Sequence, residues 1–95
     1  MLRLNSNENS LLLLIAEFAD TTDPRNRQEL EELLNDEAPD QRLVRRIGAA
    51  IVGRPPADLQ ADELKAAERF KRIAANNRRH FRYFQLTDLE TSLRS

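Results

Sequence analysis

Residues that typically begin or end helices recur along this sequence, at intervals that fit short helices. Asn5 followed three residues later by Glu8 has the form of a capping box, in which each side chain accepts a hydrogen bond from the other residue's backbone N–H. Asp23 before Pro24 is a second start, because proline at the first helical position loses no hydrogen bond. Gly53 before two prolines marks a stop. The pattern predicts helices over residues 6–19, 24–36 and 41–52.

Residues 58–84 form the longest stretch without a strong helix breaker, and we expect one long helix of roughly 30–40 Å here. Thr87 with Glu90 repeats the capping-box spacing and predicts a short last helix over residues 88–93. No stretch alternates apolar and polar side chains as a strand does, and β-branched residues are scarce. We therefore predict an all-α fold: a compact four- to five-helix bundle with one long C-terminal basic amphipathic helix, in a single domain of residues 1–95.

Gly48 lies inside the predicted third helix, where glycine costs about 1 kcal/mol of helix propensity relative to alanine. It is flanked by Ala49 and Ala50, so the helix carries only small side chains at this point. A close crossing by another helix would explain the glycine. A kink is the alternative that the sequence leaves open.

The residue types that catalysis needs are scarce. The chain has no cysteine, one histidine and two glycines, which excludes disulfides, thiolate zinc sites, a cysteine nucleophile and a glycine-rich phosphate loop. His80 has no second imidazole and no thiol to act with. We expect a protein that is not an enzyme and that uses no metal, no cofactor and no small-molecule substrate.

No membrane or export segment is expected. The apolar run from Leu11 to Ile15 is far shorter than the roughly 20 apolar residues of a membrane-spanning helix. It follows a polar stretch that includes Glu8, whereas a signal peptide begins with basic residues. We expect no membrane contact and a cytoplasmic location.

The net charge of −1 is an average over two unlike halves. Residues 1–40 hold ten acidic and three basic side chains, a charge of −7, and residues 41–95 hold twelve basic and six acidic ones, a charge of +6. Such asymmetry favours pairing within the chain, head-to-tail self-association or a charged partner.

Seven basic side chains and one acidic side chain lie between Lys65 and Arg82, a local charge of +6. On a helical wheel these cations lie away from the apolar face of the predicted long helix. We predict that this arginine face binds a partner through Lys71, Arg72, Arg78, Arg79, Arg82 and Tyr83.

An acidic protein surface and a nucleic acid are both candidate partners of the arginine face. Arginine and lysine bind phosphates, and Tyr83 would stack on a base. The sequence pI of about 5.8, however, is far below that of a dedicated nucleic-acid domain. The third alternative is that the face pairs with acidic side chains of the first half, notably Glu29, Glu32 and Asp36.

Three residues are candidates for self-association. Leu12 and Leu13 widen the apolar face of the first helix, so this helix is either surrounded by the others or covered by a second molecule. Asn77 lies on the apolar face of the long helix, where it either fixes the register of a helix interface or marks the end of the helix. We predict a homo-oligomer, with Leu12, Leu13 and Asn77 at an interface with a second copy or with another partner.

These features predict a non-catalytic protein–protein interaction module, a small regulator or adaptor that binds its partner through helix faces and associates with itself. The alternative is a DNA- or RNA-binding regulatory protein that uses the basic face of residues 65–83. The two hypotheses differ in the anion that the arginine face binds.

Overall fold

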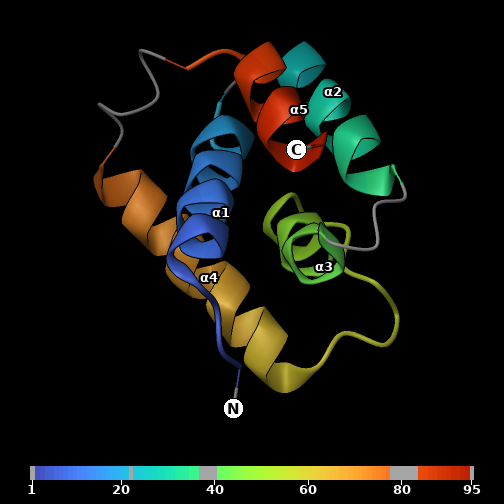
Figure 1. Cartoon of the computed structure of the whole chain (residues 1–95), viewed down its shortest axis with the longest axis vertical. Coiled ribbons are helices and arrows are strands. Elements are labelled where there is room, and N and C mark those ends of the chain that lie inside the picture. The colour runs from blue at the N-terminus through green and yellow to red at the C-terminus, as the bar shows by residue number, and fades with distance from the viewer. Residues whose placement is uncertain (1, 22, 37–40, 78–83, 95) are drawn as a thin grey trace.

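The computed structural model describes residues 2–21, 23–36, 41–77 and 84–94, and these residues form helices and connecting segments without any strand. The helices are α1 (Ser6–Ala19), α2 (Pro24–Asn35), α3 (Arg42–Ile51), α4 (Ala61–Asn76) and α5 (Leu86–Arg94), shown in Figure 1. The radius of gyration of 12.1 Å is that of a compact chain of this length. The predicted all-α, compact fold is therefore confirmed.

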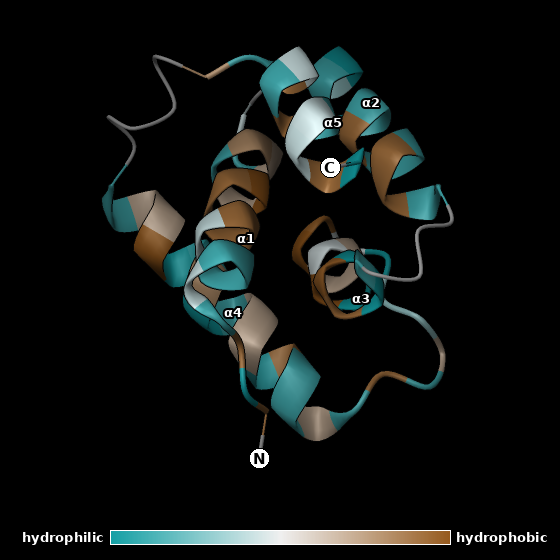
Figure 2. Cartoon of the chain, in the orientation of Figure 1, coloured by the Kyte–Doolittle hydropathy of each residue, from teal (hydrophilic) through white to brown (hydrophobic). Residues whose placement is uncertain are grey.

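The helices form three layers. α1 and α3 pack on each other in the middle, α4 packs across both of them, and α2 and α5 pack together on the opposite side (Figure 1). α1 contacts all four other helices. Hydrophobic and hydrophilic residues alternate along the helices (Figure 2), and the apolar residues Leu12 and Ile15 of α1 and Ile47 of α3 are fully buried. Seven large side chains of this core are at most 1% exposed: Leu12, Ile15, Leu30, Val44, Ile47, Leu89 and Leu93.

The predicted helix starts are present. The Asn5 side chain accepts a hydrogen bond from the Glu8 backbone N–H at 2.7 Å, and the Glu8 carboxylate accepts one from the Asn5 N–H at 3.1 Å. The Asp23 carboxylate accepts a hydrogen bond from the Arg25 N–H at 3.0 Å, with Pro24 in the first turn. These caps start α1 and α2 because they satisfy N–H groups that have no partner inside the helix.

The predicted stop at Gly53 is also confirmed. Gly53 has a φ of 92°, a left-handed conformation that glycine adopts without steric cost. Its N–H donates to the Ala50 carbonyl at 3.1 Å, and the Arg54 N–H donates to the Ala49 carbonyl at 2.9 Å. This pair of hydrogen bonds is a Schellman motif, which satisfies the last carbonyls of α3.

Gly48 lies at a close crossing of helices, as one of the two alternatives predicted. A Cβ atom at this position would lie 2.9 Å from Leu34 Cδ2 of α2 and 3.4 Å from Ile15 Cδ1 of α1. Carbon atoms in van der Waals contact are about 3.5–4.0 Å apart. The missing side chain thus lets α3 approach both neighbouring helices.

The prediction of one long helix over residues 58–84 is wrong. α4 begins at Ala61 and ends at Asn76 after 16 residues. The Asn77 side chain donates to the Ile73 carbonyl at 2.9 Å, and its φ of −129° and ψ of 46° lie outside the helical region. Asparagine side chains compete in this way for backbone groups, which makes asparagine a poor helix former.

The last helix also differs from its predicted bounds. α5 begins at Leu86, two residues before the predicted start. The Asp88 carboxylate accepts a hydrogen bond from the Gln85 backbone N–H at 3.1 Å, so the first turn is stabilised at Gln85 and not at Thr87. Of the basic segment predicted as one helix, the part up to Asn76 lies in α4, and residues 78–83 lie outside the described ranges.

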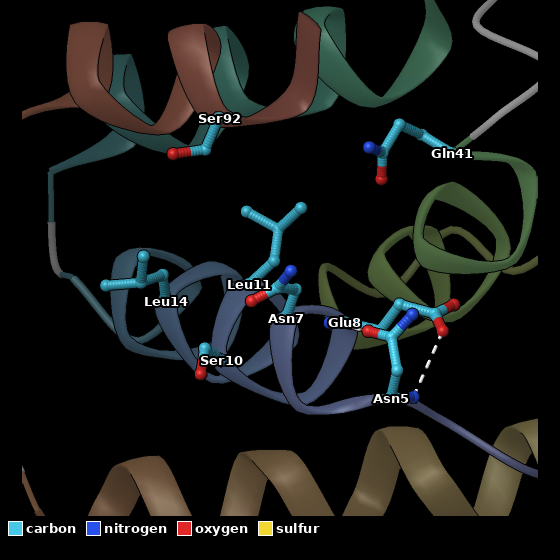
Figure 3. A pocket seen from close by; sticks show the side chains of 8 residues that line it. All are labelled: Asn5, Asn7, Glu8, Ser10, Leu11, Leu14, Gln41 and Ser92. Atoms are coloured by element: carbon cyan, nitrogen blue, oxygen red, sulfur yellow. Dashed lines mark hydrogen bonds between the residues drawn. The ribbon is translucent and has the colours of Figure 1, made fainter. Parts of the chain in front are cut away.

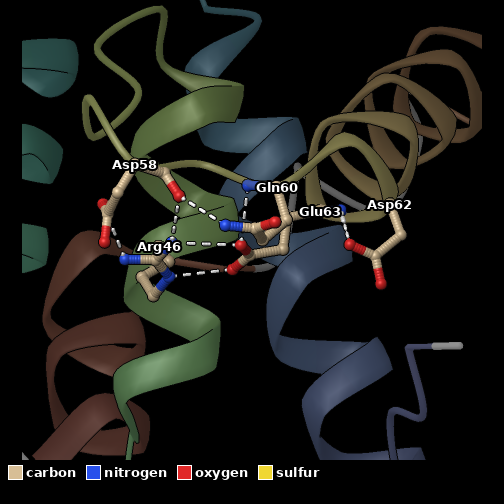
Figure 4. Close-up of polar contacts among 5 residues, drawn as sticks. All are labelled: Arg46, Asp58, Gln60, Asp62 and Glu63. Atoms are coloured by element: carbon tan, nitrogen blue, oxygen red, sulfur yellow. Dashed lines mark hydrogen bonds and ion pairs between the residues drawn. The ribbon is translucent and has the colours of Figure 1, made fainter.

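Arg46 joins α3 to the start of α4 (Figure 4). Its Nε lies 2.8 Å from Glu63 Oε2 and its Nη2 lies 3.0 Å from Glu63 Oε1, a bidentate contact, while its Nη1 lies 3.1 Å from Asp58 Oδ1. The Glu63 side chain is only 6% exposed. The hydrogen bonds from Arg46 hold the pKa of the Glu63 carboxyl below its usual value, against the opposing effect of burial. This contact fixes where α4 begins.

Candidate protein-binding surfaces

The structure describes two of the six residues of the predicted arginine face. Lys71 and Arg72 lie on α4 and are exposed. Among the described residues, neither side chain makes an ion pair with a carboxylate. The other four, Arg78, Arg79, Arg82 and Tyr83, lie outside the described residues, as does His80.

A basic groove lies between the N-terminal segment and α4. It has a volume of about 650 Å³, and its cations are Arg3, Lys65 and Arg69, all exposed. Leu2, Leu4 and Ala66 contribute apolar surface, and Asn9 and Asp62 complete the lining. With three cations against one carboxylate, the groove is suited to an anionic partner that also has apolar side chains.

Within α4, the cations follow helical spacing. Lys65, Arg69 and Arg72 are separated by four and three residues, so they lie on one side of the helix, beside the basic groove. Lys71 lies about 120° away from Lys65 around the helix. The guanidinium of Arg69 lies 4.9 Å from the centroid of the Phe70 ring, a cation–π contact that holds its side chain against the helix.

Two large apolar side chains are exposed on the same helix. Leu64 is 45% exposed and Ile73 is 37% exposed. Single exposed apolar residues are common on protein surfaces. Leu64 and Ile73 are nine residues apart, about 180° around the helix, so they do not form one apolar patch.

An acidic groove lies between α2 and α5, with a volume of about 420 Å³. Glu29, Glu32, Asp36 and Glu90 supply four carboxylates, Arg94 supplies the cation, and Leu33, Leu86 and Thr87 complete the lining. Arg94 Nη2 lies 2.9 Å from Asp36 Oδ2 and 3.2 Å from Glu90 Oε1. Within the described part of the chain no cation pairs with Glu29 or Glu32, so these two carboxylates face solvent.

The described residues show no pairing between the two charged halves through α4. Glu29, Glu32 and Asp36 were expected to pair with the arginine face if the chain neutralised itself. Asp36 pairs with Arg94 of α5 instead, because α2 packs beside α5 and on the opposite side of the molecule from α4. Among the described residues, the basic and acidic surfaces are therefore separate.

The residues expected at a self-association interface lie in different environments in the structure. Leu12 is 0% exposed and Leu13 packs against the core, because α1 is surrounded by the other four helices. The wide apolar face of α1 is thus covered by the chain itself, and Leu12 has no surface to offer a partner. Asn77 is exposed at the end of α4, where it stops the helix.

A third hollow lies at the start of α1 and is polar. It has a volume of about 550 Å³ and is lined by Asn5, Asn7, Glu8, Ser10, Leu11, Leu14, Gln41 and Ser92 (Figure 3). The hydrogen bond drawn there joins Glu8 to the Asn5 N–H, so the charged group of this hollow serves the cap of α1. Within the described ranges, no group of three or more His, Asp or Glu residues is placed to hold a metal ion.

No described helix is both long and apolar enough to cross a lipid bilayer. The two charged grooves are the candidate sites, because each places charged groups beside apolar side chains. Sequence reasoning missed the basic groove as a unit, because Arg3 and Lys65 are far apart in the chain and only the fold brings them together. The alternation of Leu2, Arg3 and Leu4, apolar on both sides of a cation, was the available signal.

The chain was also compared with known proteins. No protein-family model, no curated protein and no solved structure matches it.

Proposed function

We propose that this protein is a non-catalytic interaction module that binds an acidic protein surface through the basic groove. The observation that carries the proposal is the set of exposed cations around apolar floor residues, with Arg3, Lys65 and Arg69 in the groove and no ion pair from them to any described carboxylate. Since no carboxylate in the described part of the chain pairs with these cations, they are available to a partner.

The same observations favour protein over nucleic acid as the partner. Leu2 and Leu4, which line the groove, would contact apolar groups, which a phosphate backbone does not present. The acidic groove on the other side of the molecule and the net charge of −1 also oppose approach to a polyanion. Nucleic-acid binding by the basic residues is the alternative outcome of the test below.

The test measures binding of two fluorescent probes by anisotropy at low and physiological salt. One probe is a synthetic amphipathic peptide with glutamate and leucine at helical spacing, and the other is an oligonucleotide of the same net charge, single- or double-stranded. We expect the peptide to bind, with an affinity that falls as salt is added, and the oligonucleotide to bind more weakly. Tighter oligonucleotide binding, or no peptide binding at low salt, would overturn the proposal.

Two single variants locate the binding site. Lys65→Glu reverses a charge in the basic groove, and Lys71→Glu makes the same change on the same helix outside it. Both residues are exposed on α4, so neither change should disturb the fold. We expect Lys65→Glu to weaken peptide binding roughly tenfold, with Lys71→Glu much closer to wild type. Equal effects would show that only the overall charge matters.

A further inference from the structure

The two grooves are complementary in charge and similar in construction. The basic groove has three cations around Leu2 and Leu4, and the acidic groove has four carboxylates and one arginine around Leu33 and Leu86. The two grooves therefore carry opposite charges, and both also present apolar side chains that could pack against each other.

The grooves cannot meet within one molecule. The basic groove involves α4, which covers one side of the α1–α3 layer, and the acidic groove lies between α2 and α5 on the other side (Figure 1). The molecule measures 32 × 28 × 25 Å, so the body of the protein separates the two surfaces. Only a second molecule can bring the two grooves together.

We propose that the acidic partner of the basic groove is the α2–α5 groove of a second copy of this chain, in a head-to-tail contact. This inference rests on the proposed function and identifies its partner. Glu29 and Glu32 are the carboxylates of that groove without a described cation partner, and Lys65 and Arg69 are the two α4 cations that line the basic groove, also without a described ion pair. Pairing them neutralises four charges that the folded monomer leaves in solvent.

The contact is heterologous, since two different surfaces of the chain meet. The assembly still has a free basic groove at one end and a free acidic groove at the other, and further copies can add unless the rotation between neighbours closes a ring. Because exposed ion pairs supply much of the attraction, assembly should weaken as salt is added. Head-to-tail assembly differs in this respect from the interface that Leu12 and Leu13 would have formed, which would be apolar and little affected by salt.

The test uses two neutral double variants and their mixture. Lys65→Gln with Arg69→Gln removes charge from the basic groove only, and Glu29→Gln with Glu32→Gln removes charge from the acidic groove only. All four residues are exposed, so the variants should keep the helical spectrum and melting temperature of the wild type. Sedimentation velocity at low salt, over a roughly hundredfold range of concentration, reports the size of each species.

We expect wild type to form species that grow with concentration, while each variant alone associates roughly tenfold more weakly. An equimolar mixture of the two variants should form a 1:1 dimer and nothing larger, because only one intact groove of each sign remains. Lys71→Gln removes a charge from the opposite flank of α4, away from the groove, and serves as the control; its assembly should stay close to that of wild type.

Three results would overturn the inference: a wild type that is monomeric throughout, a dimer that neither variant weakens, or a mixture that forms no dimer. These results leave the proposed function standing if Lys65→Glu still weakens binding of the acidic peptide, because the groove would then take a different acidic protein. Loss of peptide binding together with assembly by some other route would overturn both.

Discussion

Replacement of Gly48 by alanine tests whether the close crossing of α3 with α1 and α2 decides the residue at this position. The new methyl group would lie 2.9 and 3.3 Å from the two Cδ atoms of Leu34 and 3.4 Å from Ile15 Cδ1. Leu34 is 5% exposed and Ile15 is 0% exposed, so neither side chain can turn into solvent. Some displacement of α2 or of Leu34 is therefore unavoidable.

Two effects of opposite sign determine the free energy of unfolding of Gly48→Ala. Alanine gains about 1 kcal/mol of helix propensity over glycine. Overpacking of a filled core costs about 1–3 kcal/mol. Because the shortest contact is well inside van der Waals distance, we expect the packing cost to exceed the propensity gain. The free energy of unfolding of the variant should fall by up to about 2 kcal/mol, and each kcal/mol lowers the melting temperature by roughly 4–8 °C.

A second background makes this prediction sharper. Leu34→Ala removes both Cδ atoms that the methyl group would meet, at a cost of its own of about 2–5 kcal/mol. In that background Gly48→Ala should become stabilising by about 1 kcal/mol, because the propensity gain remains and the clash is gone. Urea unfolding followed by far-UV circular dichroism measures all four proteins, since the chain has no tryptophan for fluorescence.

The reversal of sign is the decisive result. If Gly48→Ala stabilises the wild type, or changes stability equally in both backgrounds, the crossing does not require glycine and the reasoning fails. Ala49→Gly, in the same helix but only half-buried, calibrates the propensity effect and should cost about 1 kcal/mol.

Three further predictions concern other contacts. Arg46 lowers the folded-state pKa of Glu63, so the stability from this pair is present above the ordinary glutamate pKa of about 4.3 and is lost as pH falls through the lower folded-state value. Glu63→Gln has no carboxylate to protonate, so its urea midpoint should fall less than that of wild type as pH is lowered from 7. Leu12→Ala should cost about 2–5 kcal/mol in thermal or urea unfolding without changing the sedimentation of the folded protein, and altered assembly instead would place Leu12 at an interface. Gly53→Ala should cost about 1–2 kcal/mol because φ is 92° there, and an unchanged melting temperature would show that the turn relaxes at no cost.

Much of the fold was predictable from local signals. The caps at Asn5 and Asp23 and the stop at Gly53 operate through hydrogen bonds to residues two to five positions away, so neighbouring sequence is sufficient to identify them. The end of α4 was missed because Asn77 has two roles that sequence alone does not separate. The residues around Asn77 are compatible with an asparagine inside a helix and with one that ends it. The backbone conformation at Asn77 shows that it ends the helix.

The candidate sites were less predictable. The sequence located excess positive charge in the second half of the chain, but the groove combines Lys65 with Arg3, which lies in the acidic half. The apolar face of α1 indicated either a partner or a central position, and the contacts of α1 with every other helix decide for the central position. Surfaces made by residues distant in sequence depend on helix packing, which no local pattern encodes.

By itself, the sequence determined the helical class, three helix boundaries and the opposite charges of the two halves, because capping, helix propensity and charge depend on residue type and near neighbours. The sequence left two explanations for Gly48, and the contacts with Leu34 and Ile15 decided for the close crossing. Only the tertiary structure decided that α4 and the α2–α5 pair lie on opposite sides of the α1–α3 layer. That separation leaves Glu29 and Glu32 away from Lys65 and Arg69, since a side chain reaches only a few ångströms and the core lies between them. The opposite charges of these residues therefore cancel in the net charge of the chain, but the residues do not pair with one another within one molecule.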